Sequence, residues 1–116
     1  MIIKIEQSTK LDNFALIKVH PGSAAIVDLD DFENLNQYKW YIIKQHGLPY
    51  AARKVSTNGK IYWVRMHRQV MHTSTGLIVH HKNRRTLDNR KINLENMTDK
   101  DHQAEHRDPF LRFVRK

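Results

Sequence analysis

The sequence predicts a small α+β domain, with an antiparallel sheet in its first half and a strand–loop–strand–helix unit in its second. Short runs of β-branched and aromatic residues recur between turn residues up to residue 65, which is typical of antiparallel strands. A further apolar run then leads into two adjacent histidines, His80 and His81. A helical pattern downstream carries two more, His102 and His106. The chain has 116 residues, enough for one such domain.

Three apolar runs predict the first strands, at residues 2–6, 14–19 and 24–28. His20-Pro21-Gly22-Ser23 is a turn sequence, so we expect the second and third runs to form a hairpin. Residues 29–35 follow a helical pattern that begins with two aspartates, as expected where a helix N-terminus favours negative charge. This short helix would bury Phe32 and Leu35 against the sheet.

Three more strands are predicted, at residues 40–43, 50–55 and 61–65. Asn58-Gly59 lies between the last two, and this dipeptide is a strong signal for a tight hairpin turn. A short helix is expected over residues 66–71, followed by a loop over residues 72–76. We therefore treat residues 1–65 as a sheet region that packs on residues 66–116, the two together forming one compact domain.

The second half opens with a short strand at residues 77–79 that ends in His80 and His81. Neighbouring side chains of a strand point to opposite faces, so these two histidines should have different tasks. A basic, turn-rich loop over residues 82–92 and a second strand over residues 93–97 follow.

A helix is expected to start at Thr98, because Asp101 three residues later completes a capping pair with it. Asp108-Pro109 would end this helix. His102 and His106 lie four residues apart, so on a helix they share one face and could offer two imidazoles to one cation.

The net charge of +8 is uneven, since residues 61–116 contribute +6 and residues 1–60 contribute +2. A small basic domain often binds a polyanion such as nucleic acid. Cysteine is absent, which excludes disulfides and thiolate metal ligands and fits a reducing compartment. No apolar run approaches the roughly 20 residues that span a bilayer, and we see no signal peptide. These features predict a soluble, intracellular protein.

The motif residues resemble those of the HNH endonucleases, above all the phage- and intron-encoded homing-type members. The offsets of 12 residues from His81 to Asn93 and of 9 residues from Asn93 to His102 suit that family. His80 stands where these proteins usually have aspartate, so the site also resembles the bacteriocin-type members, which pair His-His with His-x-x-x-His. The matching segments are Val79-His80-His81, Leu87-Asp88-Asn89-Arg90 and Asn93-Leu94, and in the first half Ala25-Ile26-Val27-Asp28, Asp31-Phe32 and Lys39-Trp40-Tyr41.

The resemblance implies a ββα-metal fold and metal-dependent hydrolysis of phosphodiester bonds in double-stranded DNA, leaving 5′-phosphate and 3′-hydroxyl ends. It implies that His81 is the general base and that Asn93 fixes the orientation of that base. His80, His102 and His106 would be the ligands of one divalent metal ion. The family commonly uses Mg²⁺ or Mn²⁺, whereas three imidazoles would also suit Zn²⁺, Ni²⁺ or Co²⁺.

The candidate DNA contacts are cations beside the presumed catalytic histidine, because lysine and arginine bind the phosphate backbone. They are Lys82, Arg84, Arg85 and Arg90 in the loop and Arg68 in the preceding helix. Arg68 could instead brace the motif together with His67, and Asp88 could pin the loop through an arginine.

Two other functions stay open: a non-catalytic DNA-binding protein with a structural Zn²⁺, and a nuclease directed at RNA or at nucleic acids in general. The sequence also leaves open whether cleavage is a nick or a double-strand break, and whether the protein is a monomer or a homodimer. The resemblance suggests the cytoplasm of a bacterial or phage-infected cell, without membrane association.

Overall fold

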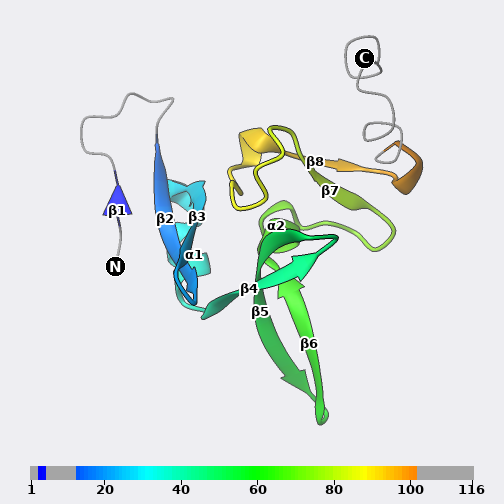
Figure 1. The fold of residues 1–116 in the computed structure, drawn as a ribbon, viewed down its shortest axis with the longest axis horizontal. Helices are drawn as coiled ribbons and strands as arrows, with labels where there is room; N and C mark the ends of the chain where they lie inside the picture. Colours follow the sequence, from blue (N-terminus) through cyan, green and yellow to red (C-terminus); the bar gives the residue numbers. More distant parts are fainter. Residues whose placement is uncertain (1–2, 5–12, 102–116) are drawn as a thin grey trace.

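The structure is a computed structural model, and it describes residues 3–4 and 13–101. It contains a mixed sheet with short helices and, apart from that sheet, a two-stranded hairpin (Figure 1). The predicted α+β class is therefore confirmed. Within the described ranges no helix is long and apolar enough to cross a membrane.

The first three strands lie side by side at one end of the sheet. β2 (Phe14–His20) pairs antiparallel with β3 (Ser23–Asp28), which confirms the predicted hairpin. The short strand β1 (Ile3–Lys4) lies antiparallel to β2 on its other edge. Every second residue of β2, from Ala15 to Val19, is buried, as the alternation of a half-buried strand requires.

Helix α1 (Leu29–Asn36) begins where β3 ends. It buries Phe32 and Leu35 in the core, as predicted. Asp30 and Asp31 lie in its first turn, where the helix dipole favours negative charge. The apolar face of α1 is thus the reason why the helix must lie on the sheet.

The remaining strands of the sheet form an antiparallel meander: β4 (Trp40–Gln45), β5 (Leu48–Thr57) and β6 (Lys60–Arg65). Asn58 and Gly59 connect the last two strands with φ angles of 52° and 77°. Both angles are left-handed, which is the conformation that Asn-Gly favours in a two-residue hairpin turn. The predicted hairpin is confirmed.

The prediction of a purely antiparallel sheet is wrong at one junction. β4 runs parallel to β2, with Val19 opposite Trp40 and His20 opposite Tyr41. Because α1 has to bury its apolar face, it carries the chain back along the sheet to the end of β2. β4 starts there and continues in the direction of β2, so the sheet is mixed.

The second half adds α2 (Met66–Met71) and a hairpin of β7 (Ile78–His81) and β8 (Leu94–Met97). A short 3-10 helix, η2 (Lys91–Asn93), leads into β8. The expected strand–loop–strand arrangement is therefore present, with β8 beginning one residue later than predicted.

The helix expected after β8 falls mostly outside the described residues. Residues 99–101 are helical, and the N–H of Asp101 donates to the Thr98 hydroxyl at 3.2 Å. This hydrogen bond is the predicted N-cap. His102, His106 and the predicted stop at Asp108-Pro109 lie outside the described residues.

One apolar core connects the sheet to the second half of the chain. Trp40 is fully buried in it and donates from Nε1 to the Leu35 carbonyl at 2.7 Å. The second half contributes Met66 and Val70 from α2, Val79 from β7 and Leu94 from β8. The β7–β8 hairpin is therefore held against the sheet by apolar packing.

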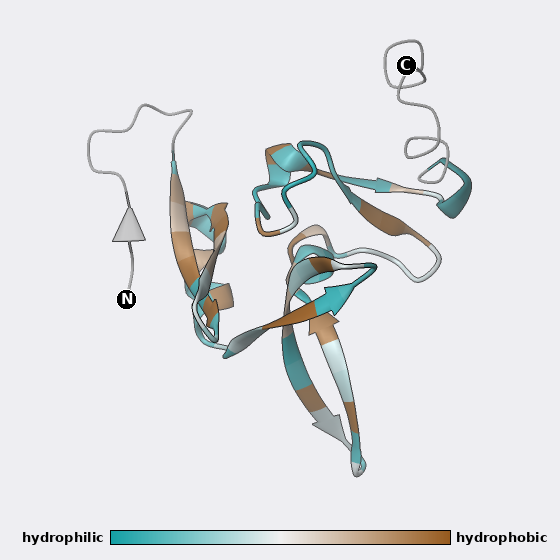
Figure 2. Cartoon of the chain, viewed as in Figure 1, coloured by the Kyte–Doolittle hydropathy of each residue, from teal (hydrophilic) through white to brown (hydrophobic). Residues whose placement is uncertain are grey.

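The far end of the β5–β6 hairpin extends away from this core (Figure 1). Both hydrophobic and hydrophilic segments occur along it (Figure 2). Ile61, Tyr62 and Trp63 are 63%, 50% and 37% exposed. An exposed aromatic run of this kind can serve as a contact surface.

We expect Trp40→Phe to lower the free energy of unfolding by about 2 kcal/mol, because it removes buried volume and the hydrogen bond that Nε1 donates to the Leu35 carbonyl. Urea unfolding of both proteins measures the difference. Trp63→Phe is the matched control, since its ring is partly exposed, and it should cost less than about 1 kcal/mol. Equal losses in the two variants would contradict the assigned role of Trp40.

Candidate active site

His80 and His81 form the end of β7, and the strand pairing separates their directions. His80 lies opposite Glu95 and His81 lies opposite Leu94, so the two imidazoles start from opposite faces of the hairpin. Both are buried, with exposed fractions of 3% and 6%. The face of His81 is shared with the core residue Leu94, which directs His81 toward the main sheet.

His81 is held by one specific hydrogen bond. Its Nε2 lies 2.8 Å from Oδ1 of Asn89, a side chain that is itself buried. An amide oxygen only accepts hydrogen bonds, so in this arrangement Nε2 of His81 is the donor and carries the proton. Nδ1 is then the basic nitrogen of the ring, in the neutral tautomer that a general base needs.

Two aromatic side chains surround the His81 ring. The ring centroid of His67, from α2, lies 5.2 Å away, and that of Tyr50, from β5, lies 5.9 Å away. Burial lowers the pKa of His81 below its usual 6.5, although Asn89 and Asp88 partly oppose this effect. His81 is therefore neutral near pH 7 and able to accept a proton.

His67 is a second buried neutral imidazole. Burial, together with the nearby His81, Arg65 and Arg68, lowers the pKa of His67 to about 3. Within the described residues its Nδ1 has no hydrogen-bond partner. His67 thus behaves as an uncharged packing residue behind His81.

The loop after β7 is stabilised by the carboxylate of Asp88. Nε and Nη2 of Arg90 donate to its two oxygens at 2.8 and 2.7 Å, and Nδ2 of Asn83 donates at 2.9 Å. Burial alone would raise the pKa of Asp88, but these hydrogen bonds outweigh it and hold the pKa below its usual value. Asp88 therefore stays charged and pins the loop through an arginine.

Asn93 bridges the two ends of the same loop. Its Nδ2 donates to the Asp88 carbonyl at 2.8 Å, and its Oδ1 accepts from the Asn83 N–H at 2.9 Å. Its own carbonyl accepts from the Lys82 N–H at 2.8 Å. Asn93 is buried and fixes the backbone that follows His81, without touching the imidazole through any of these bonds.

The front half of the chain positions this loop. The Ile26 N–H donates to the Leu87 carbonyl at 2.8 Å, and the Asn89 N–H donates to the Ile26 carbonyl at 2.7 Å. The Thr86 hydroxyl also donates to the Pro49 carbonyl. Strands β3 and β5 thereby determine where Asn89, the partner of His81, is placed.

The N-terminal end of α1 is bonded to Lys91, the first residue of η2. The carboxylate of Asp28 accepts from the Lys91 N–H at 3.0 Å, and Asp31 lies 2.6 Å from Nζ of Lys91. Asp28 is the N-cap residue of α1 but makes no side-chain bond to that helix. Its carboxylate instead accepts a hydrogen bond from the first N–H of η2.

Both adjacent histidines border one pocket of about 320 Å³. Among the described residues, Arg84 is the only cation that lines it, and it lies in the turn closed by its own N–H and the His81 carbonyl, 2.9 Å apart. The pocket therefore lies where the end of β7 meets the loop that follows it and the start of β5. Its lining residues are Leu48, Tyr50, Val79, His80, His81, Arg84 and Thr86.

The predicted DNA-contacting cations fall into two groups. Lys82, Arg84 and Arg85 are exposed on the loop. Arg90 forms an ion pair with Asp88 and is 29% exposed, so its guanidinium stabilises the conformation of the loop. Arg68 donates from its terminal nitrogens to the Leu77 and Ser74 carbonyls at 2.8 and 3.2 Å, which is the bracing role. DNA contact by each of the five stays a prediction.

The metal ligands are placed only in part. His80 is buried at the end of β7, whereas His102 and His106 lie outside the described residues. Among the residues that the structure describes, no three histidine, aspartate or glutamate side chains gather closely enough to hold a metal ion. Of the predicted ligand set, His80 is thus the member that the structure places beside the pocket.

Sequence reasoning missed the individual importance of Asn89 and Tyr50. Asn89 was visible only as the middle residue of Asp88-Asn89-Arg90, and nothing in that pattern says which of its atoms meets His81. Tyr50 belongs to the aromatic and β-branched run that predicts a strand, so its presence needed no functional explanation. Both roles depend on the path of the loop past β3 and β5.

No protein-family model, no curated protein and no solved structure matches this chain.

We expect acid to destabilise the protein through His67. Below pH 6.5 the unfolded chain takes up a proton at this position, while the folded chain does not until about pH 3. The free energy of unfolding should therefore fall by about 1.4 kcal/mol per pH unit between these limits from this residue alone.

His67→Phe keeps an aromatic ring and removes the titration, so its loss of stability with falling pH should be smaller by this amount. Urea unfolding at several pH values between 6.5 and 4 measures both slopes. Parallel curves for the two proteins would show that His67 does not remain neutral in the folded state.

Proposed function

We propose that the protein is a metal-dependent endonuclease of HNH type that hydrolyses phosphodiester bonds of double-stranded DNA. The observation that carries this proposal is the environment of His81, a buried neutral imidazole whose Nε2 is bonded to Asn89. A histidine held in this way is suited to take a proton from water near neutral pH. The pocket that it shares with His80 and Arg84 offers a place for a phosphate group.

In the proposed reaction, Nδ1 of His81 accepts a proton from a water molecule as the water oxygen attacks phosphorus. The bond from phosphorus to the 3′ oxygen breaks, which leaves a 5′-phosphate and, after proton uptake, a 3′-hydroxyl. Arg84 would bind the non-bridging oxygens of the phosphate. Asn89 and Asn93 act on His81 by position, the first through the imidazole and the second through the loop.

A divalent cation, when bound, would stabilise the negative charge that develops on the leaving oxygen. His80 would be one of its ligands, and His102 and His106, which lie outside the described residues, would be the others. Imidazole ligands favour Zn²⁺, Ni²⁺, Co²⁺ or Mn²⁺ over Mg²⁺, which prefers oxygen.

We expect His81→Ala to reduce cleavage of supercoiled plasmid by about 100- to 10,000-fold, the usual contribution of a general base. The assay compares Mg²⁺, Mn²⁺, Co²⁺, Ni²⁺ and Zn²⁺ with EDTA and follows open-circle and linear products. Binding of the variant to DNA should stay within about threefold of the parent, because Arg84 and the other loop cations remain.

His72→Asn is the matched control, since it removes an exposed imidazole outside the site and asparagine accepts the left-handed conformation found there. It should cleave like the parent. A parent that retains metal and binds DNA but cleaves no substrate would support the structural-zinc alternative. Preference for RNA over duplex DNA in the same assay would favour the RNA-directed alternative.

We expect the rate of cleavage to rise with pH and to level off above a midpoint lower than 6.5, because burial lowers the pKa of His81. Asn89→Asp keeps an acceptor oxygen and adds negative charge beside the imidazolium, so it should move the midpoint upward. Asn89→Leu removes the acceptor and should reduce the plateau rate by at least about tenfold.

Single-turnover cleavage across the pH range measures both the midpoint and the plateau. The shift of the midpoint separates a positioning role from a loss of stability, which would change the plateau alone. If Asn89→Leu cleaves at the parent rate with the parent midpoint, Asn89 does not position the base.

A further inference from the structure

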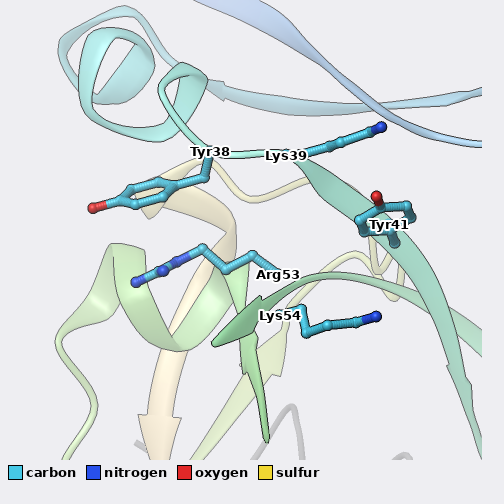
Figure 3. A pocket seen from close by; sticks show the side chains of 5 residues that line it. All are labelled: Tyr38, Lys39, Tyr41, Arg53 and Lys54. Carbon is cyan, nitrogen blue, oxygen red and sulfur yellow. The ribbon is translucent and has the colours of Figure 1, made fainter. Parts of the chain in front are cut away.

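A second pocket, of about 240 Å³, lies on the sheet outside the candidate active site. It forms where β4 begins and β5 continues: the last β5 residue paired with β4 is Ala52, opposite Tyr41. From Arg53 onward β5 is paired with β6 alone. The residues that line the pocket are Tyr38, Lys39, Tyr41, Arg53 and Lys54 (Figure 3).

Lys39 and Lys54 extend toward the same side of this pocket, the side on which Tyr41 lies (Figure 3). Nζ of Lys39 is 5.6 Å from the ring centroid of Tyr41, and Nζ of Lys54 is 5.6 Å from that of Trp63. The two rings pack edge to face at 6.1 Å. Each ammonium group is thus held over one member of an aromatic pair.

Arg53 lies on the opposite side of the pocket with Tyr38 (Figure 3). Its guanidinium stacks 3.9 Å from the Tyr38 ring centroid, and its Nε donates to Oε1 of Gln69 at 2.8 Å. The orientation of Arg53 is therefore fixed before any ligand binds, which lowers the entropic cost of binding.

The charge of this pocket is not neutralised within the described part of the chain. Three cations line it and no carboxylate does, and none of the three forms an ion pair with a described residue. Lys39 and Lys54 are exposed. A concave site with this excess of positive charge attracts an anion.

Lys54, which lines the pocket, lies on the same face of β5 as a residue of the candidate active site. Tyr50, Ala52 and Lys54 alternate along β5 and so share one face, and Trp63 lies opposite Lys54 on that face. Tyr50 is the residue that contacts His81. Four residues of strand separate Tyr50 from Lys54, which corresponds to about 13 Å.

We propose that Lys39, Lys54 and the Tyr41 hydroxyl bind a backbone phosphate of the same DNA duplex. This inference rests on the proposed function. A site about 13 Å from Tyr50 is within reach of the same duplex, because phosphates follow one another at only 3.4 Å of axial rise along each strand. The second site would fix the register of the duplex on the protein without reading its sequence.

The test measures binding of a labelled DNA duplex by fluorescence anisotropy in EDTA, so that no cleavage occurs. We expect Lys39→Gln/Lys54→Gln to weaken binding by about fivefold to 30-fold at about 0.15 M salt, as loss of one or two phosphate contacts predicts. The slope of log K against log salt should fall in magnitude by about 0.9 to 1.8.

The matched control is Lys44→Gln/Lys60→Gln, which removes the same charge from exposed positions that do not line the pocket. It should weaken binding by less than about threefold. Equal losses for the two pairs would overturn the proposal, because they would indicate a general effect of net charge.

Tyr41→Phe tests the hydroxyl without changing the ring packing, and Tyr62→Phe is its control at an exposed position. We expect only Tyr41→Phe to weaken binding, by about threefold to tenfold, the effect of one hydrogen bond to a charged group. If Tyr41→Phe binds the duplex with the affinity of the parent, the Tyr41 hydroxyl does not contact the phosphate.

Failure of the proposed function has a different readout. The parent could cleave no DNA with any metal while Lys39→Gln/Lys54→Gln selectively weakens duplex binding. That result would support this site as part of a DNA-binding protein without nuclease activity. A parent that binds no duplex but binds vesicles containing anionic lipid would overturn the assignment to DNA.

Discussion

The candidate site depends on the two backbone hydrogen bonds that Ile26 makes with the loop after β7. One holds the Leu87 carbonyl and the other holds the Asn89 N–H, so the loop is attached to β3 on both sides of Asp88. Asn89 in turn holds His81. Since β3 belongs to the sheet built by the first half of the chain, the imidazole has a fixed position only when that sheet has formed. A short segment that contains His81 and Asn89 therefore needs the rest of the domain to hold these side chains in place.

The electrostatics of the loop follow from the same arrangement. Asp88 is buried beside Arg90, and the resulting ion pair lets the chain keep a carboxylate close to His81 without exposing it. That carboxylate and Asn89 partly oppose the effect of burial on the His81 imidazole, whereas His67 has no such support. Two histidines whose rings lie next to each other therefore differ in their surroundings: Asn89 and Asp88 act to raise the pKa of His81, whereas Arg65 and Arg68 lower that of His67 further.

Most of the fold could be predicted from the sequence because its signals are local. Asn58-Gly59 specified a turn, the aspartates before Phe32 specified a helix start, and Thr98 specified a cap. The parallel pairing of β4 with β2 could not be predicted in this way, since it depends on how α1 packs across the sheet. The site shows the same division. The resemblance to the HNH endonucleases indicated His80, His81 and Asn93, but the partner of His81 and the second cationic pocket arise from contacts between distant segments.

The backbone of Arg84 has a consequence for how this sequence can change. Its φ of 64° is left-handed, a conformation that costs an arginine about 1 kcal/mol and costs glycine almost nothing. Glycine would therefore make the turn after His81 more favourable, but it would leave the pocket without its guanidinium. Selection for thermal stability alone would favour this replacement, whereas selection for the phosphate binding that we propose for Arg84 would oppose it. Under the proposed function, position 84 is thus a place where heat resistance and activity compete, and libraries screened only for stability should accumulate variants that lack this guanidinium.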